Sequence, residues 1–244
     1  MSRPEFDTRP PPLRQAMLTR PLENGQIWQG PLAAQPSLPP GPPRPLLLFL
    51  HGSSGLNEQT QACQRWLAEA LGLASLAPDS FARPDRPRYQ SPAPMAQYEA
   101  VHALRLEEIR MALAALPLMP WVDARRLLLA GSSEGGVAVA RWRGREFAGR
   151  LIYGWSCEDN YFVEQARNGF EADCALLNIL SGDDPFFGAA SRFNQGRGVD
   201  GDSRRALAGM PRAKLALLPQ APHPLYNLPE ARALTADFLR ELLA

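Results

Sequence analysis

The sequence predicts an α/β protein in which helices cover both faces of a mostly parallel, twisted sheet. Two observations predict this class. After Pro45, short apolar runs alternate with longer segments of helical periodicity. Four of the runs end in clusters of Gly, Ser, Asp or His. Runs that are apolar throughout are typical of strands buried on both faces, and strands that alternate with helices form parallel sheets.

The chain before these runs predicts an antiparallel hairpin at one edge of the sheet. Residues 14–20 and 26–32 can be extended, and Glu23-Asn24-Gly25 between them contains the Asn-Gly signal of a tight turn. Residues 36–45 are rich in proline, so we expect a linker there rather than a helix or a central strand. Residues 1–45 are expected to be part of the same domain as residues 46–244.

Six strands and four helices are predicted beyond the linker. The strands are residues 46–50, 73–77, 126–130, 150–153, 175–180 and 214–218. The helices are residues 57–71, 95–116, 134–147 and 229–243, and Asn57 is the expected N-cap of the first. The carboxyl ends of parallel strands meet at one edge of a sheet, where sites form. We therefore expect the polar clusters that follow four of these strands to lie close together.

The composition excludes several classes of partner. The 244 residues carry 26 Lys and Arg against 25 Asp and Glu, so a net charge of +1 gives no general attraction for nucleic acid or anionic membranes. No stretch is long and apolar enough to span a bilayer, and the polar residues 1–7 do not resemble a signal peptide. We expect a cytoplasmic monomer or homodimer.

The three cysteines, Cys63, Cys157 and Cys174, do not have the spacing of metal ligands, and we expect no metal or other cofactor. In a reducing compartment Cys157 and Cys174 are expected to stay separate thiols, whereas in an exported chain they could pair.

Residues 131–135, Gly-Ser-Ser-Glu-Gly, form a G-x-S-x-G motif between a predicted strand and a predicted helix. A sharp strand-to-helix turn holds the central serine, Ser133, in a strained conformation, and small residues on either side let neighbouring chain pass closely. A glycine-rich helix start that only packs tightly or binds an anion does not explain the serine at the apex. The motif therefore predicts that Ser133 is a nucleophile.

A serine nucleophile needs a histidine base, and the base needs an orienting carboxylate. In folds that use this motif the chain order is Ser, acid, His. The sequence has three histidines, and His51 and His102 both precede Ser133. His223 is therefore the predicted base, and we expect His51 to brace its own loop.

The acid is predicted just after the strand at 175–180, where Asp183 and Asp184 are adjacent. We prefer Asp184 because it lies deeper in the turn, where its side chain can swing toward the last loop. Asp183 stays an alternative for the acid, or it caps the turn. Glu158 and Asp159, one strand earlier, are a third choice.

An oxyanion formed on attack needs two backbone N–H donors. One is expected from Glu134, the residue after the nucleophile. The other is expected from Ser53, in the loop after the strand at 46–50, where Gly52 frees the backbone.

These residues resemble the α/β-hydrolase fold, and within it the dienelactone-hydrolase-like group, over residues 46–244. Residues 77–83, Ala-Pro-Asp-Ser-Phe-Ala-Arg, are similar to the proline-aspartate-x-aromatic-alanine-arginine segment of dienelactone hydrolases. The arginine of that segment helps to bind the substrate's carboxylate, so the resemblance implies that Arg83 binds substrate. Residues 83–88 could equally be a solvated basic loop.

The chain departs from dienelactone hydrolases at three positions. They have cysteine as the nucleophile where this chain has Ser133, glutamate where it has Gly52, and a second arginine where it has Asn227. These departures leave the resemblance in scaffold intact and indicate a serine-esterase site on it. The pair His51-Gly52 also resembles that of serine carboxylesterases.

A minimal lid is expected, because only residues 154–174 lie between the strands at 150–153 and 175–180, although residues 186–211 could add a partial cover. Six aromatic residues in these segments could line a pocket or equally pack onto the core. They are Trp155, Tyr161, Phe162, Phe186, Phe187 and Phe193.

The sequence therefore predicts a serine hydrolase that cleaves small to medium carboxylic esters through an acyl-enzyme on Ser133, with a small-molecule ester as its partner. Two alternatives stay open. One is a peptidase or acyltransferase with the same triad, and the other is a non-catalytic binding protein on the same scaffold.

Overall fold

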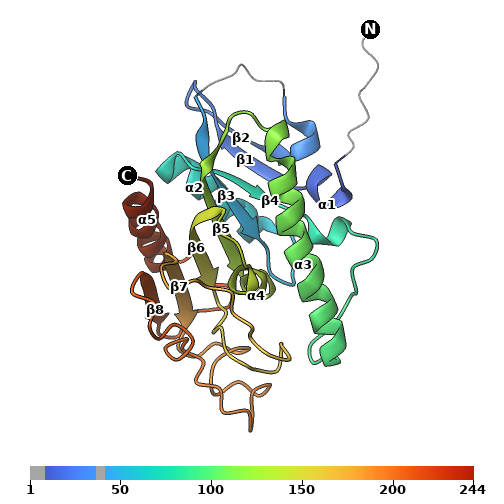
Figure 1. Ribbon diagram of the computed structural model, residues 1–244, viewed down its shortest axis with the longest axis vertical. Coiled ribbons are helices and arrows are strands. Elements are labelled where there is room, and N and C mark those ends of the chain that lie inside the picture. The colour runs from blue at the N-terminus through green and yellow to red at the C-terminus, as the bar shows by residue number, and fades with distance from the viewer. Residues whose placement is uncertain (1–8, 37–41) are drawn as a thin grey trace.

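The computed structural model describes residues 9–36 and 42–244, which form one eight-stranded sheet with the strand order β2-β1-β4-β3-β5-β6-β7-β8 (Figure 1). The strands are β1 (Met17–Pro21), β2 (Ile27–Pro31), β3 (Arg44–Leu50), β4 (Ala74–Ala77), β5 (Val122–Ser132), β6 (Phe147–Tyr153), β7 (Leu176–Ser181) and β8 (Ala213–Leu218). Strands β3 to β8 pair in parallel, and β1 pairs antiparallel to both β2 and β4. The predicted fold class is confirmed.

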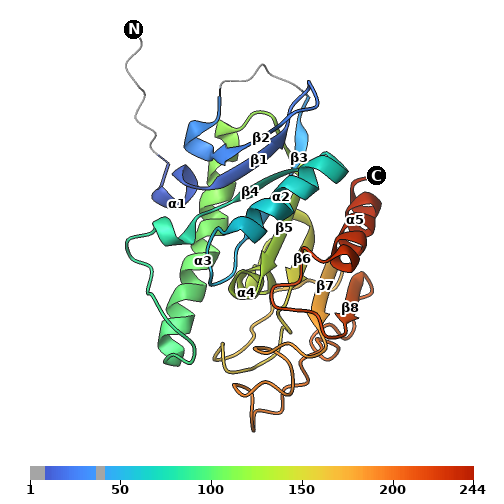
Figure 2. The same cartoon turned by 180° about the vertical axis from the view of Figure 1, so that it is seen from behind.

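Helices cover both faces of this sheet, as predicted. They are α1 (Pro11–Arg14), α2 (Glu58–Leu71), α3 (Met95–Ala115), α4 (Glu134–Arg141) and α5 (Pro229–Leu243), with short 3-10 turns η1 (Leu32–Ala34), η2 (Ser80–Ala82) and η3 (Leu116–Leu118). Figure 1 shows α3 in front of the sheet, and Figure 2 shows α2 and α5 in front of the opposite face. The predicted cap is also present, because the Asn57 side chain accepts a hydrogen bond from the Thr60 N–H at the start of α2.

Side chains that alternate along β3 divide the core into two layers. Leu46, Leu48 and Leu50 pack into the layer under α3 and α4, whereas Leu47 and Phe49 pack into the layer under α2 and α5. A strand with apolar side chains on both faces must be covered on both faces. The continuous apolar run of β3 therefore follows from its place in the middle of the sheet.

The N-terminal hairpin forms the antiparallel edge that the sequence predicts. Its turn contains Gly25, whose φ of 79° lies in the region that favours glycine, and the N–H of Leu22 donates to the carbonyl of Gln26. The one-turn helix α1, which sequence reasoning missed, precedes this hairpin. Its Leu13 is buried in the core, and the carbonyl of Pro12 accepts a hydrogen bond from Asp79.

Pro45 corrects one expectation, because it lies inside the central strand β3 rather than in a linker. Ladder pairing of β3 with β4 begins at Leu46, and the pairing with β5 shifts register between Arg44 and Leu46. Pro45 thus occupies an irregular position where no ladder hydrogen bond needs its missing N–H. Residues 37–41 of the predicted linker, and the polar segment 1–7, lie outside the described residues.

Helix α4 is shorter than the predicted 134–147, because it ends at Arg141 and β6 begins at Phe147. The buried side chain of Arg150 donates to the carbonyls of Val139, Trp142 and Gly144. These hydrogen bonds satisfy carbonyl groups that lack partners after the helix ends. A side chain from the next strand therefore caps the C-terminal end of the helix. The periodicity of the local sequence cannot predict such a tertiary contact.

The loops that follow β3, β5, β7 and β8 gather at the carboxyl edge of the sheet. Residues 154–175, between β6 and β7, and residues 182–212, between β7 and β8, contain no helix or strand and lie together at the lower end of Figure 1.

Nowhere in residues 9–36 and 42–244 is a helix both long and apolar enough to cross a membrane.

Candidate active site

Ser133 lies at a sharp turn between the end of β5 at Ser132 and the start of α4 at Glu134. Its backbone has φ 54° and ψ −117°, a combination that costs a residue with a side chain about 1–3 kcal/mol. Hydrogen bonds hold the turn from both sides, because the Ser133 N–H donates to Tyr153 and its carbonyl accepts from Val137. The turn has the geometry of a nucleophile elbow.

Gly131 and Gly135 make this turn possible because neither position has room for a side chain. A Cβ at Gly131 would lie 2.5 Å from the carbonyl oxygen of Gly135, and a Cβ at Gly135 would collide with the carbonyl oxygen of Leu50. The motif's glycines therefore let α4 start directly against the ends of β5 and β3.

Asp184 and His223 form the hydrogen-bonded pair at the same edge of the sheet. His223 Nδ1 lies 2.8 Å from Asp184 Oδ2, while Asp184 Oδ1 accepts the N–H groups of Phe186 and Phe187. Burial raises the pKa of Asp184, but the hydrogen bond and charge of His223 and the two N–H groups outweigh burial and lower this pKa below its usual value. Asp184 therefore stays ionised beside the ring.

The other candidate acids lie elsewhere. Asp183 is exposed, and its N–H donates to Ser181. Glu158 is buried and accepts the N–H groups of Asp200 and Gly201, so it ties the segment after β6 to the segment after β7. Asp159 accepts the N–H of Ala166 within its own loop.

Ser133 and His223 line one cavity of about 180 Å³ at this edge. The two side chains are not hydrogen-bonded to each other, and catalytic hydrogen bonds often tighten only when substrate is bound. Four of the six aromatic residues singled out from the sequence also line the cavity: Tyr161, Phe162, Phe186 and Phe187. Trp155 is fully buried in the core, and Phe193 packs against Tyr161 and Phe186.

The side chains that line the cavity are mostly aromatic or neutral and polar. Besides His223, its polar side chains carry a hydroxyl or an amide: Ser53, Ser54, Asn57, Thr60, Ser91, Ser132, Ser133, Tyr161 and Tyr226. Among the described residues, no Asp, Glu, Lys or Arg lines this cavity. A charged substrate group would therefore find no counter-charge here.

Both residues that are expected to donate to the oxyanion lie near Ser133. Ser53 lines the cavity, and Glu134 is the first residue of α4. The N–H of a residue at this position has no acceptor within its own helix. The side chain of Glu134 is fully buried.

Arg83 is placed outside the cavity lining. Its guanidinium binds Asp85 through two hydrogen bonds of 2.9 and 2.7 Å and Glu107 through one of 2.9 Å. The hydrogen bonds to Asp85 and Glu107 raise the pKa of Arg83 despite partial burial. Two carboxylates therefore already neutralise the arginine that the resemblance implies for substrate binding.

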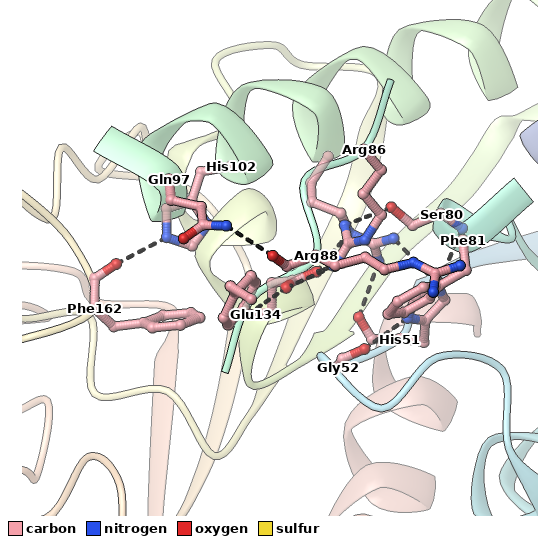
Figure 3. A network of polar contacts seen from close by, with 12 residues as sticks. His51, Gly52, Ser80, Phe81, Arg86, Arg88, Gln97, His102, Glu134 and Phe162 are labelled. Atoms are coloured by element: carbon pink, nitrogen blue, oxygen red, sulfur yellow. Dashed lines mark hydrogen bonds and ion pairs between the residues drawn. The ribbon is translucent and has the colours of Figure 1, made fainter. Parts of the chain in front are cut away.

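The remaining two histidines are fully buried. His51 Nδ1 lies 2.7 Å from the carbonyl oxygen of Gly52, and His51 Nε2 accepts the Ser80 N–H. His102 Nε2 lies 2.9 Å from the carbonyl oxygen of Phe162 (Figure 3), and burial lowers the pKa of His102 to about 4. His102 thus fastens the cavity-lining segment after β6 to helix α3.

Sequence reasoning missed two features of the site. Gly154, at φ 62°, lies directly after β6, and a Cβ there would come within 3.0 Å of the His223 ring. Its position at a strand end was the available signal. The second feature is a group of buried charged side chains behind Ser133, which includes Arg86 and Arg105.

A metal centre does not emerge from the described residues, since no three His, Cys, Asp or Glu side chains among them are grouped to hold an ion. The three cysteines are free thiols, and Cys63 and Cys157 are buried.

Comparison with known proteins rests on structure alone. No protein-family model matches the sequence. No curated protein matches it either.

Several solved structures match over almost the whole length of the chain. A cold-adapted esterase from an Arctic intertidal metagenomic library has 16% identity and a TM-score of 0.59, covering 93% of this chain and 94% of that one. A dienelactone hydrolase-like promiscuous phosphotriesterase from metagenomic libraries has 17% identity and a TM-score of 0.57, and the match covers 93% of this chain and 97% of that one. A protein of Thermus thermophilus has 22% identity and a TM-score of 0.57, and the match covers 84% of this chain and 91% of that one. With its parallel sheet and strand-to-helix serine turn, the protein has the α/β-hydrolase fold that dienelactone hydrolase-like proteins and esterases share.

Proposed function

We propose that the protein is a serine hydrolase that cleaves small to medium, uncharged carboxylic esters. The observation that carries this proposal is the hydrogen bond between Asp184 and His223, because His223 lines the same cavity as the strained Ser133. A nucleophile, a base and an orienting acid at one cavity are the parts that acyl transfer needs. Esterases among the structures with this fold support the same reaction class.

In the first half of the reaction Ser133 Oγ attacks the ester carbonyl and its proton passes to His223 Nε2. Asp184 holds the other ring nitrogen and stabilises the imidazolium. The negative charge on the former carbonyl oxygen is stabilised by the N–H groups of Ser53 and Glu134. When the C–O bond breaks, His223 gives its proton to the leaving alcohol and the acyl group stays on Ser133.

In the second half water takes the place of the alcohol. His223 removes a proton from water, the hydroxide adds to the acyl carbon, and the second tetrahedral intermediate collapses. The bond to Ser133 Oγ breaks, the acid product leaves, and Ser133 regains its proton from His223.

The uncharged cavity supports the restriction to neutral esters. Moving a carboxylate from water into a site without a partner is strongly unfavourable, because the charge loses its hydration. With Arg83 held by Asp85 and Glu107, the cavity offers no cation to a carboxylate substrate. This separates the proposed substrate from that of dienelactone hydrolases.

Replacing Ser133 with Ala tests the nucleophile. We expect Ser133→Ala to lower kcat for p-nitrophenyl butyrate by roughly 10⁵-fold, because residues of such a site act as a unit. Covalent labelling by a fluorophosphonate should also be lost. Ser132→Ala is the matched control, since Ser132 is the adjacent serine and lines the same cavity, and it should keep the labelling.

Labelling of Ser133→Ala at the wild-type rate would refute the nucleophile. Ser133-dependent labelling without turnover of any short ester would favour a peptidase or acyltransferase. Neither labelling nor turnover in the wild-type protein would favour a binding protein.

Asparagine substitutions at the two adjacent aspartates test the acid. We expect Asp184→Asn to lower kcat by about 10⁴-fold, because the amide no longer holds the histidine in the productive tautomer. Asp183→Asn is the control and should change kcat less than twofold, since Asp183 is exposed. Steady-state kinetics on p-nitrophenyl butyrate measure both, and the reverse order of effects would move the acid to Asp183.

Two ethyl esters that differ only in charge test the neutral substrate class. Ethyl succinamate and monoethyl succinate are isosteric, but only the second carries a carboxylate at pH 7. We expect kcat/KM for monoethyl succinate to be roughly 100-fold lower, or about 2.7 kcal/mol, measured by ethanol release. Arg83→Ala should leave this ratio unchanged. A preference for monoethyl succinate that Arg83→Ala removes would instead make Arg83 the carboxylate-binding residue.

A further inference from the structure

Behind the cavity lies a group of polar side chains, buried apart from the half-buried Tyr89, that the proposed reaction steps do not use. Its members come from the end of β3, the segment after β4, helix α3 and the start of α4. We call it the buried charge cluster, and it consists of His51, Ser80, Arg86, Tyr89, Arg105, Glu108 and Glu134. Figure 3 shows the part around His51, Ser80, Arg86 and Glu134.

One arm of the cluster ends on the residue after the nucleophile. The Glu134 carboxylate is fully buried and receives Arg86 Nη2 at 2.9 Å on both oxygens. The Tyr89 hydroxyl donates to Glu134 Oε2 at 2.5 Å and also interacts with the Ser53 side chain. Burial and the Glu134 carboxylate raise the pKa of Tyr89, so its hydroxyl keeps the proton that it donates. This arm fixes the residue whose backbone N–H is the first proposed oxyanion donor.

The other arm ends on the peptide group that carries the second donor. Burial and the charge of Arg105 lower the pKa of His51 well below its usual value, so the ring is neutral. Because Nε2 accepts the Ser80 N–H, Nδ1 carries the proton and donates to the Gly52 carbonyl at 2.7 Å. The carbonyl and the N–H of one trans peptide point in opposite directions. Holding the Gly52 carbonyl toward His51 therefore turns the Ser53 N–H away from it.

Two arginines join these arms. Arg86 Nη1 donates to Ser80 Oγ at 2.7 Å, while Ser80 holds the His51 ring. Arg105 Nη2 donates to the His51 carbonyl at 2.9 Å, and Arg105 Nε lies 3.7 Å from Glu134 Oε1. Glu108 accepts Arg105 Nη1 at 2.7 Å, so the two guanidinium groups face two carboxyl groups. A continuous set of polar contacts thus connects the Gly52–Ser53 peptide with Glu134.

We propose that the buried charge cluster positions the two oxyanion donors relative to each other, with Arg86, Tyr89 and Arg105 as positioning residues. The proposal rests on the serine-hydrolase function proposed above. Its physical basis is that buried ion pairs gain little stability over apolar packing, whereas the hydrogen bonds that they form hold neighbouring groups in fixed positions. Here one end of the cluster is bonded to the Gly52 carbonyl, and the other end is bonded to the side chain of Glu134, the residue after Ser133.

The test compares mild changes in the cluster with matched changes elsewhere. Tyr89→Phe removes one hydroxyl. Arg86→Lys keeps the positive charge but removes the guanidinium hydrogen bonds to both carboxylate oxygens of Glu134. Arg141→Lys is the control for the second, because Arg141 holds Glu99 through two hydrogen bonds of 2.7 and 2.9 Å between α4 and α3. Thr235→Val is the control for the first, because it removes a buried hydroxyl on α5 that bonds the Tyr153 hydroxyl at 2.9 Å, away from the cluster.

We expect Tyr89→Phe and Arg86→Lys to lower kcat for p-nitrophenyl butyrate by roughly 10- to 100-fold, with KM changed less than threefold, because misplaced donors stabilise the oxyanion less. The inhibition constant of a trifluoromethyl ketone, which forms an oxyanion on the serine, should rise by the same factor. Both controls should change these quantities less than twofold.

A fall in thermal stability with unchanged kcat and inhibition constant in Tyr89→Phe would overturn the proposal and make the cluster structural. Equal kcat losses in the controls would overturn it as well. Should Arg86→Lys fail to fold, Tyr89→Phe decides alone. Failure of the proposed function is distinguishable, because the wild-type protein would then show no Ser133-dependent ester hydrolysis with which to compare the variants.

Discussion

Helix α4 starts directly against the end of strand β3, where the carbonyl oxygen of Leu50 leaves no room for a side chain at Gly135. Much of the site follows from this close approach. It bends the chain sharply at Ser133, into a backbone conformation that costs about 1–3 kcal/mol. It also brings the unpaired N–H at the start of α4 next to the loop after β3, where Ser53 lies. The strain at one residue is thus held by the packing of the helix start against the ends of two neighbouring strands.

The charges around this turn are distributed unevenly. The cavity in front of Ser133 is lined by aromatic rings, hydroxyl groups and one amide, whereas the space behind it contains paired charges. Arg86 and Arg105 face Glu134 and Glu108 there, and each of the four is buried. The separation has a functional consequence in our account. Neutral substrate meets an uncharged surface, while the peptide groups that stabilise developing charge are held from behind by a rigid polar network.

Features that depend on neighbours in the sequence were predictable, and features that depend on packing were not. The alternation of apolar runs and helical segments predicted the sheet and its helices, and the G-x-S-x-G spacing predicted the turn at Ser133. The missing N–H of proline argued against a central strand at Pro45, but the register shift between Arg44 and Leu46 accommodates Pro45 within β3. Arg105 and Glu108, three residues apart on a helix, have the spacing of an ordinary surface pair, and only the tertiary structure buries them. The preference for Asp184 over Asp183, by contrast, came from its place in the turn, and Asp184 Oδ2 lies 2.8 Å from His223 Nδ1.

A crystal structure of the protein after reaction with a fluorophosphonate tests the nucleophile and the two oxyanion donors together. We expect a bond between phosphorus and Ser133 Oγ, with the phosphoryl oxygen about 2.7–3.1 Å from the backbone nitrogens of both Ser53 and Glu134. Phosphorus on any other residue, or a phosphoryl oxygen turned away from both nitrogens, would contradict this expectation.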